Sequence, residues 1–325
     1  MRKLFFKILY FTFLHKLFFI INNKKLATLM FHRINPDMDH LWPSMSPATF
    51  EKLIKLFLKN AEIVSINKIY KENFIKNNKF ILTFDDGYKD FLIYAFPIIK
   101  KYNLEVNLNI CPKLVSNSSI PWTQKINLLM NKDNKKLRNL LEKFSIKYNK
   151  HNFNSKIFNF ICNEIHNLDS EGYKKFIYNL DKIPINTKHI LLNWNEIIYC
   201  SKNGIIIGNH SNSHLNINKL NNQELDFEIY KSKKYIKNVI DKDADIFSIP
   251  NGKINKKSLN YISGSHKIIL FSDENNNLVI HKKNYIGLNR INISIDDPYE
   301  EFFRAFGFHL YLKRYLKFFL FQKEQ

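Results

Sequence analysis

The sequence is poor in the residues and patterns that mark several protein classes. Its three cysteines, Cys111, Cys162 and Cys200, are far apart and odd in number, so neither a disulfide framework nor a cysteine-based metal site is predicted. Only 29 acidic residues stand against 50 lysines and arginines, which gives a formal net charge of +21 at pH 7. This charge favours an anionic partner such as a membrane surface or a lipid phosphate. No nucleic-acid-binding motif is present, and we expect no nucleic-acid partner.

The sequence also lacks an uninterrupted apolar run of the ~20 residues that a membrane-spanning helix needs. Residues 1–25 are basic and aromatic, but Lys7, His15 and Lys16 interrupt them, and no small-residue cleavage site follows. We therefore expect an amphipathic helix, packed on the core or lying on a membrane surface, rather than a removable signal peptide. An uncleaved anchor is the alternative. Residues 299–325 repeat this pattern, which predicts a second basic aromatic helix.

Hydrophobic residues make up 45% of the 325-residue chain, enough for a sizeable core. Between residues 26 and 298, short apolar runs alternate with helical patterns, which favours an α/β sheet or barrel. Residues from about 122 to 190 lack strand patterns and predict a helical insertion in one connection. The predicted strands are 26–31, 63–66, 80–84, 106–110, 205–207, 246–249, 267–271 and a run within 285–295.

Three of these strands end in unusual polar groups. The strand 80–84 is followed by Asp85 and Asp86, the strand 205–207 by a histidine pair, and the strand 246–249 by Pro250 and Asn251. Two adjacent carboxylates repel each other when buried, and a cation nearby would relieve that repulsion. Taken alone, a sequence of two aspartates and a glycine is more often a loop with a helix N-cap than a catalytic site.

The histidine pair makes a metal site the stronger interpretation. His210 and His214 are four residues apart, which on a helical turn places both rings on one face within reach of one ion. In α/β barrels, sites form where the carboxyl ends of the strands meet. Two imidazoles and one carboxylate make a facial set with open coordination positions. This set suits zinc, which lowers the pKa of a bound water to about 7. A non-haem iron oxygenase would use the same set.

Three motifs resemble those of a known family. Thr83-Phe84-Asp85-Asp86-Gly87 resembles the first motif of the polysaccharide deacetylases, also called the NodB-homology domain or carbohydrate esterase family 4. Residues 208–214 resemble the second motif and residues 247–252 the third. The resemblance spans roughly residues 26 to 295. It implies a distorted (β/α) barrel that removes acetyl groups from N-acetylated sugars with the help of a divalent metal, for which zinc is the expected ion.

The resemblance also implies roles for individual residues. Asp86, His210 and His214 would bind the metal, and Asp85 would be the base that takes a proton from the attacking water. An ion held by Asp86 would leave Asp85 charged beside it, which makes this division physically reasonable. The loop at Pro250 and Asn251 would contact the substrate, with backbone N–H groups stabilising the oxyanion.

Two features depart from the family pattern. Ser248 stands where the third motif usually has an arginine that orients the site, and Arg290 is the candidate replacement. The general acid has two candidates, His281 after an apolar run and His32 after the first strand. We favour His32, because members with permuted motifs carry their acid in such an N-terminal position. A histidine of the barrel core is the competing interpretation.

These expectations combine into one hypothesis. The chain would be a hydrolase that acts on N-acetyl groups of hexosamines in a polysaccharide or lipid-linked glycan, in the biosynthesis of surface glycans. The alternatives are an O-acetyl esterase and a non-catalytic glycan-binding protein with a degraded site. We expect a cytoplasmic protein peripheral to the inner membrane, with a secreted or periplasmic location as the alternative.

Overall fold

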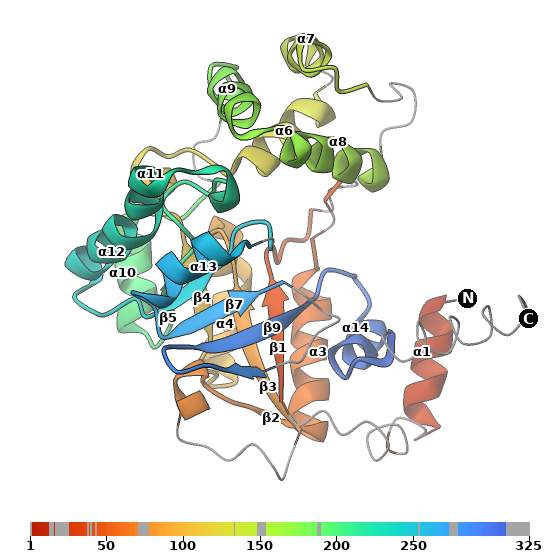
Figure 1. Cartoon of the computed structure of the whole chain (residues 1–325). Coiled ribbons are helices and arrows are strands. Elements are labelled where there is room, and N and C mark those ends of the chain that lie inside the picture. Colours follow the sequence, from red (N-terminus) through yellow and green to blue (C-terminus); the bar gives the residue numbers. More distant parts are fainter. Residues whose placement is uncertain are drawn as a thin grey trace, which may run out of the picture.

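The apolar runs of the sequence form a parallel barrel in the computed structural model of the chain (Figure 1). The structure describes residues 2–12, 16, 26–37, 39, 41–42, 44–70, 78–132, 134–147, 154–186, 190–252, 254–272 and 279–309. The barrel strands are β1 (Leu26–Phe31), β3 (Lys79–Phe84), β4 (Asn107–Ile110), β5 (Ile206–Asn209), β6 (Ile246–Ser248), β7 (Ile268–Phe271) and β9 (Ile286–Asn292).

The seven strands pair in the order β1-β3-β4-β5-β6-β7-β9, and β9 pairs with β1 to close the ring. Every pair in the ring is parallel. Two short strands lie outside it: β2 (Glu62–Ile63) beside β3, and β8 (Val279–His281) antiparallel to β9. The predicted (β/α) barrel is confirmed. The strand expected at 63–66 is shorter than predicted, and a 3₁₀ turn occupies Ile66–Tyr70.

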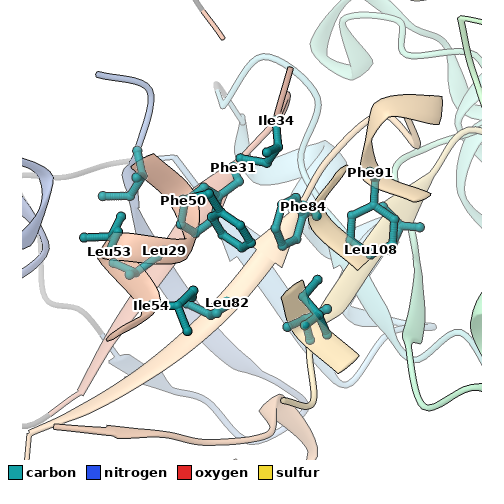
Figure 2. Packing of buried hydrophobic residues seen from close by; sticks show 14 of the residues in the cluster. Leu29, Phe31, Ile34, Phe50, Leu53, Ile54, Leu82, Phe84, Phe91 and Leu108 are labelled. Carbon is teal, nitrogen blue, oxygen red and sulfur yellow. The ribbon is translucent and has the colours of Figure 1, made fainter. Parts of the chain in front are cut away.

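The strands are buried on both faces because helices cover the outside, which explains their nearly continuous apolar sequences. Figure 2 shows Phe31 of β1, Phe84 of β3 and Phe50 of helix α3 (Pro47–Asn60) packed together. The Phe31 and Phe84 rings stack with centroids 5.1 Å apart, and Phe50 lies 5.5 Å from Phe31. The side chain of Ser46 caps α3, with proline at its first position, as the sequence predicted.

Two of the barrel helices contain π-helical turns. Helices α11 (Asn222–Asp226) and α12 (Ser232–Ile240) are joined by such a turn at Phe227–Lys231. Another, at Phe91–Ala95, precedes α4 (Phe96–Lys101). Also described around the barrel are α5 (Pro112–Ser116), α10 (Trp194–Lys202) and α13 (Lys256–Ser263).

The long connection between β4 and β5 contains four helices with a core of their own. They are α6 (Trp122–Asn131), α7 (Lys135–Lys143), α8 (Ser155–Asn167) and α9 (Ser170–Asp181). Their apolar faces share one cluster, into which Leu41 from the loop after β1 also packs. In Figure 1 these helices lie together beyond the carboxyl end of β1. The insertion therefore stands over the end of the barrel at which the polar motifs emerge.

The two basic aromatic regions meet on the outside of the barrel. Helix α1 (Arg2–Phe11) packs on α14 (Pro298–Ala305), with Phe6 5.7 Å from Phe303 and Tyr10 5.4 Å from Phe302 between ring centroids. The rest of the helix expected over 299–325 lies outside the described residues from residue 310 onward. Among the described residues, no helix is both long enough and apolar enough to cross a membrane.

Candidate active site

The first motif forms a tight turn at the carboxyl end of β3. Asp86 and Gly87 both adopt left-handed backbone conformations, with φ of 71° and 72°. Such angles cost an aspartate little and a glycine nothing, so the pair reverses the chain within two residues. The chain that returns from the insertion holds the turn, because the Leu192 N–H donates to the Gly87 carbonyl at 2.9 Å. The aspartates do not cap a helix; both side chains face the barrel interior and are buried.

The second motif brings the two histidines together by a turn rather than a helix. The expected helical turn is absent: residues 210–216 have no helical hydrogen bonds, and Ser211 and His214 have φ of 61° and 57°. The buried carboxylate of Glu228 holds this turn, because it accepts the backbone N–H groups of Asn212 and Ser213, each at 2.9 Å. The two imidazole rings end 4.9 Å apart between centroids.

Asp86, His210 and His214 form a compact buried cluster suited to one metal ion. Their ligand atoms all lie within 4.8 Å of one another. The Nε2 atoms of both histidines lie 3.3 Å from Asp86 Oδ1, which has no hydrogen-bond partner although it is buried. His210 Nδ1 donates to the Ser248 carbonyl at 2.9 Å, which fixes the tautomer with Nε2 free to ligate. These residues fit a divalent metal.

The pKa values of the two histidines are shifted in opposite directions. Burial lowers the pKa of His214 to about 4, so that its ring is neutral at pH 7. Burial also acts to lower the pKa of His210, but the negative charges of Asp85 and Asp86 outweigh it and raise that pKa. A metal ion must displace the proton held there, so metal affinity should fall at low pH.

Asp85 lies in a cage of donors beside the cluster. Arg290 contacts both carboxylate oxygens, Oδ1 at 2.9 Å and Oδ2 at 2.8 Å. Asn109 Nδ2 donates to Oδ1 at 2.8 Å and Ser248 Oγ to Oδ2 at 3.0 Å. Burial opposes the charged form of Asp85, but Arg290 and then His210 more than compensate, and the pKa of Asp85 lies well below its usual range.

Arg290 reaches this position from the strand that closes the barrel. It lies on β9, pairs in register with Thr28 of β1, and is completely buried. Its guanidinium also donates to Ser248 Oγ at 2.9 Å. An arginine from β9 and a serine from β6 together therefore surround Asp85.

Gly208 of the second motif makes room for this cage. A Cβ atom at Gly208 would lie 2.1 Å from Oδ1 of Asn109 and 2.9 Å from Nδ2 of Asn107. No side chain fits there without displacing Asn109, which orients Asp85. The glycine is therefore required for space and not for an unusual backbone angle.

The two candidates for the general acid lie at opposite ends of the barrel. His32 follows the carboxyl end of β1, and the charges of Asp86 and Asp85 act on it; burial is the largest influence and lowers its pKa. His32 shares a cavity with Asn251, which has φ of 60° in the loop after β6. His281 is exposed on β8 and pairs with Ile286 at the start of β9, at the other end. The arrangement brings His32 to the site and leaves His281 away from it.

Three further contacts of the site were missed in the sequence. Glu228 holds the histidine turn, Asn109 orients Asp85, and the buried Tyr88 hydroxyl donates to Gln124 of the insertion at 3.3 Å. Glu228 and Gln124 lie inside helical patterns and carry no sequence signal. Asn109 had a weak one, since an asparagine inside a buried parallel strand needs a polar partner.

The comparisons with known proteins agree with this geometry. Residues 162–264 match the sequence model of the family described as polysaccharide deacetylase. A search of curated proteins found no match. Among solved structures, the chain is similar to the putative polysaccharide deacetylase BA0330 from Bacillus anthracis, with a TM-score of 0.57 and 13% identity over 86% of this chain and 68% of that one.

The match extends over almost the whole length of two other solved structures. The Streptococcus pyogenes deacetylase PplD matches with a TM-score of 0.56 and 16% identity, over 86% of this chain and 97% of that one. IcaB from Ammonifex degensii matches with a TM-score of 0.54 and 13% identity, over 86% and 96%. At these identities the likeness establishes the fold. Residues 162–264, which include the histidine motif and the residues 247–252, are the part of the chain that matches the polysaccharide deacetylase sequence model.

Proposed function

We propose that this protein is a metal-dependent deacetylase that hydrolyses N-acetyl groups of hexosamines in a polysaccharide or lipid-linked glycan during surface-glycan biosynthesis. The observation that carries the proposal is the buried cluster of Asp86, His210 and His214 with the ionised Asp85 directly beside it. A carboxylate that stays charged next to a three-ligand metal site is what hydrolysis by an activated water requires.

The chain's own residues divide the reaction between them. Bound by Asp86 and the two histidines, a divalent ion, expected to be zinc, would supply Lewis-acid activation of the acetyl carbonyl and of the attacking water. Asp85 accepts the proton of that water as it attacks the amide carbon. Because burial lowers the pKa of His32, this ring must first take up a proton, and the proton that Asp85 accepts from the water supplies it. His32 then donates it to the leaving nitrogen as the C–N bond breaks. The backbone N–H of Asn251, which follows Pro250, lies in the loop that would face the oxyanion.

The cage around Asp85 indicates which oxygen takes the proton. Arg290 contacts both oxygens and does not distinguish them. Oδ1 also accepts the amide of Asn109, whereas Oδ2 also accepts the freely rotating hydroxyl of Ser248 and is the oxygen that lies 4.0 Å from His210 Nε2 of the cluster. We therefore assign the base function to Oδ2, with Ser248 turning toward another acceptor when the proton arrives.

The test is acetate release from a panel of N-acetylated and O-acetylated glycans, measured with and without a chelator. We expect release from N-acetylhexosamine substrates, loss of activity on chelation, and recovery with added zinc. Release that is unaffected by exhaustive chelation would contradict the metal-dependent reaction. Faster release from O-acetyl than from N-acetyl substrates would favour the esterase, since the same groups attack an ester.

A non-catalytic glycan-binding protein is the alternative from a different class. The case for it rested on the missing arginine at Ser248. Arg290 contacts Asp85 through both guanidinium nitrogens and removes the main reason to regard the site as degraded. Glycan binding without any acetate release would nevertheless favour this alternative.

We further propose that α1 places the protein on the cytoplasmic face of the inner membrane. Phe6 and Tyr10 face the core, whereas the opposite side of the helix exposes Leu4, Phe5, Ile8 and Phe11, each by more than half. Arg2, Lys3 and Lys7 lie on the same helix and would attract anionic lipid. A lipid-linked substrate would then be presented close to the protein.

Flotation with anionic vesicles tests this placement. We expect the full chain to float, and the triple variant Leu4→Ser, Phe5→Ser, Ile8→Ser to remain in the soluble fraction. These side chains are exposed, so the core is preserved. Substitution of Ile93 and Phe227 by serine, two apolar residues exposed elsewhere, is the matched control and should not reduce flotation. Equal flotation of the triple variant and the full chain would contradict the proposal.

A further inference from the structure

A second cavity, of about 520 Å³, lies between the helical insertion and the turn that carries the two histidines. Helices α5, α6 and α9 supply most of its wall, and Ser213 and Leu215, on either side of His214, contribute the rest together with residues 183–185. The volume falls within the ~300–1,000 Å³ typical of small-molecule sites. No step of the proposed hydrolysis uses this cavity.

Much of the cavity wall is apolar. Trp122 of α6 and Tyr173 of α9 are 3% and 0% exposed, and their rings meet edge to face with centroids 6.3 Å apart. Ile177 and Ile183 extend the apolar surface along and beyond α9. Such a wall accepts a hydrocarbon chain, because burying the chain there removes apolar surface from water.

The same cavity also carries positive charge. The described residues that line it include Lys113, Lys125 and Lys174, of which Lys174 is paired with Glu224 at 2.7 Å. The charges of Lys125 and Lys113 both act on the carboxyl group of Asp181, which lines the cavity too. These three groups together carry one positive charge, which an anionic ligand would balance.

Lys125 is the buried member of this group. It is 9% exposed, and its Nζ donates to the backbone carbonyl of Asp181 at 3.0 Å. The carbonyl is a neutral acceptor, so this bond does not pair the ammonium charge. Burial lowers the pKa of Lys125, and the charge of Asp181 offsets that effect only in part. A buried cation is costly unless it is paired, and an anionic group at this point would reduce the cost.

A second donor at the cavity is available to a ligand. The indole Nε1–H of Trp122 is buried and has no hydrogen-bond partner among the described residues. Buried polar groups are rarely left unsatisfied in native proteins, and an indole N–H can only donate. Trp122 and Lys125 are three residues apart on α6, which places both side chains on one face of the helix. One group with two oxygen atoms can therefore accept from both.

We propose that this cavity binds an amphiphilic anion, with its charged oxygen atoms at Lys125 and Trp122 and its apolar chain against α9. The ligand class is a single-chain lipid with one negative charge. A fatty acid and a lipid phosphodiester share this chemistry, since each joins one oxyanion to a hydrocarbon chain. The inference goes beyond the proposed deacetylase reaction and does not depend on it.

Isothermal titration calorimetry of the metal-loaded full chain at 0.15 M NaCl tests the site. The probes are octane-1-sulfonate, a monoanion that ligates metal ions weakly, and octane-1-sulfonamide, its neutral counterpart at pH 7. We expect the sulfonate to bind at least tenfold more tightly. In Lys125→Met, its affinity should fall about tenfold, since a charge-assisted hydrogen bond is lost, and that of the sulfonamide should not change. Lys132→Met changes an exposed lysine at the end of α6 that does not border the cavity, and should behave as the wild type.

Thermal unfolding separates loss of the site from loss of the fold. The sulfonate should raise the unfolding temperature of the wild type and of Lys132→Met, but not that of Lys125→Met. Trp122→Phe keeps an aromatic ring without the N–H, and decides the question if Lys125→Met does not fold; it should weaken sulfonate binding about fivefold. Equal affinity for sulfonate and sulfonamide, or sulfonate binding unchanged in both variants, would overturn the proposal.

Octanoate and ethyl octyl phosphate distinguish the two sources of the anion. Both should bind the wild type more tightly than Lys125→Met, and the one with the higher affinity identifies the head group. If neither depends on Lys125, the proposal fails for lipids. Because every readout is binding, the absence of acetate release from glycans would refute the proposed function and leave this result unaffected.

Discussion

The barrel side and the insertion side of this site differ in burial and in charge. On the barrel side, Asp85, Asp86 and Arg290 are at most 2% exposed, and each charge is held by a partner of opposite sign or by hydrogen bonds. On the insertion side, α8 contributes the exposed amides Asn159 and Asn163 to a cavity of about 560 Å³ shared with His32, and the described residues that line this cavity include no lysine, arginine, aspartate or glutamate. Buried charges are tolerated only when their partners are fixed, so the barrel wall allows little variation. An exposed amide can be exchanged at small cost in stability.

This difference separates chemistry from recognition. The barrel fixes charges in a dry environment, where their interactions are strong and their geometry is rigid. The exposed polar residues of the insertion can be replaced without disturbing that geometry. Changes on the barrel side should therefore affect kcat and stability, whereas changes on the insertion side should affect KM.

The largest effect is expected for Asp85→Asn. The amide cannot accept the proton of the attacking water, so kcat should fall by about 10²–10⁴-fold. The ligands Asp86, His210 and His214 are unchanged, so bound metal, measured by elemental analysis, should be retained. His210→Ala is the comparison and should lose both metal and activity. Full activity of Asp85→Asn would refute the assignment of the base.

Arg290→Gln should combine a loss of activity with a loss of stability. Removing one partner of a buried ion pair costs about 3–5 kcal/mol, because the remaining Asp85 is left buried and uncompensated. Urea unfolding measures this cost. Arg290→Lys keeps the charge but cannot contact both oxygens in the same geometry, so it should recover more stability than activity. Equal recovery of both would mean that Arg290 acts only through its charge.

The strands were the most predictable part of the fold. The runs 26–31 and 80–84 became β1 and β3 to within one residue, because strands buried on both faces have continuous apolar sequences. The π-helical turn at Phe227–Lys231 had no such signal, since its residues keep the helical pattern and only the hydrogen bonding changes. The short strand β2 was overestimated because a 3₁₀ turn continues its apolar pattern.

At the site, the motifs predicted which strand ends carry the polar groups, because the polar residues directly follow apolar runs in the sequence. The contacts between those groups depend on tertiary structure. Arg290 reaches Asp85 only because β9 pairs with β1 and closes the barrel. The histidines meet through the left-handed residues Ser211 and His214, which nothing in their spacing indicates.

Glu228→Gln should have an intermediate effect, on stability and on metal binding. The N–H groups of Asn212 and Ser213 both donate to Oε2 of Glu228, so an amide oxygen placed there can still accept them, but the negative charge that strengthens both bonds is lost. We expect a destabilisation of about 1–3 kcal/mol and weaker metal binding, because the turn also carries His214. Calorimetric zinc titration and thermal unfolding would check both. Unchanged zinc affinity would show that the turn holds its shape without Glu228.

The smallest effect on activity is expected for Glu301 of α14, which lies on neither side of the site. Burial raises its pKa to about 7, although Arg304 and the N–H groups of Ile295 and Ser294 act to lower it. Since the folded-state pKa lies above the unfolded value, the folded protein binds the extra proton between about pH 4.5 and 7, and stability falls as pH rises through this window. Glu301→Gln cannot ionise, so it should remove up to ~1.4 kcal/mol per pH unit of slope from the unfolding free energy. Urea unfolding from pH 5 to pH 8 measures this slope, and kcat at pH 7 should change little because the carboxylate is outside the charge network of Asp85. A parallel fall in kcat would mean that the protonation of Glu301 affects the cavity next to His32 through Ser294, which donates to Glu301 and lines that cavity.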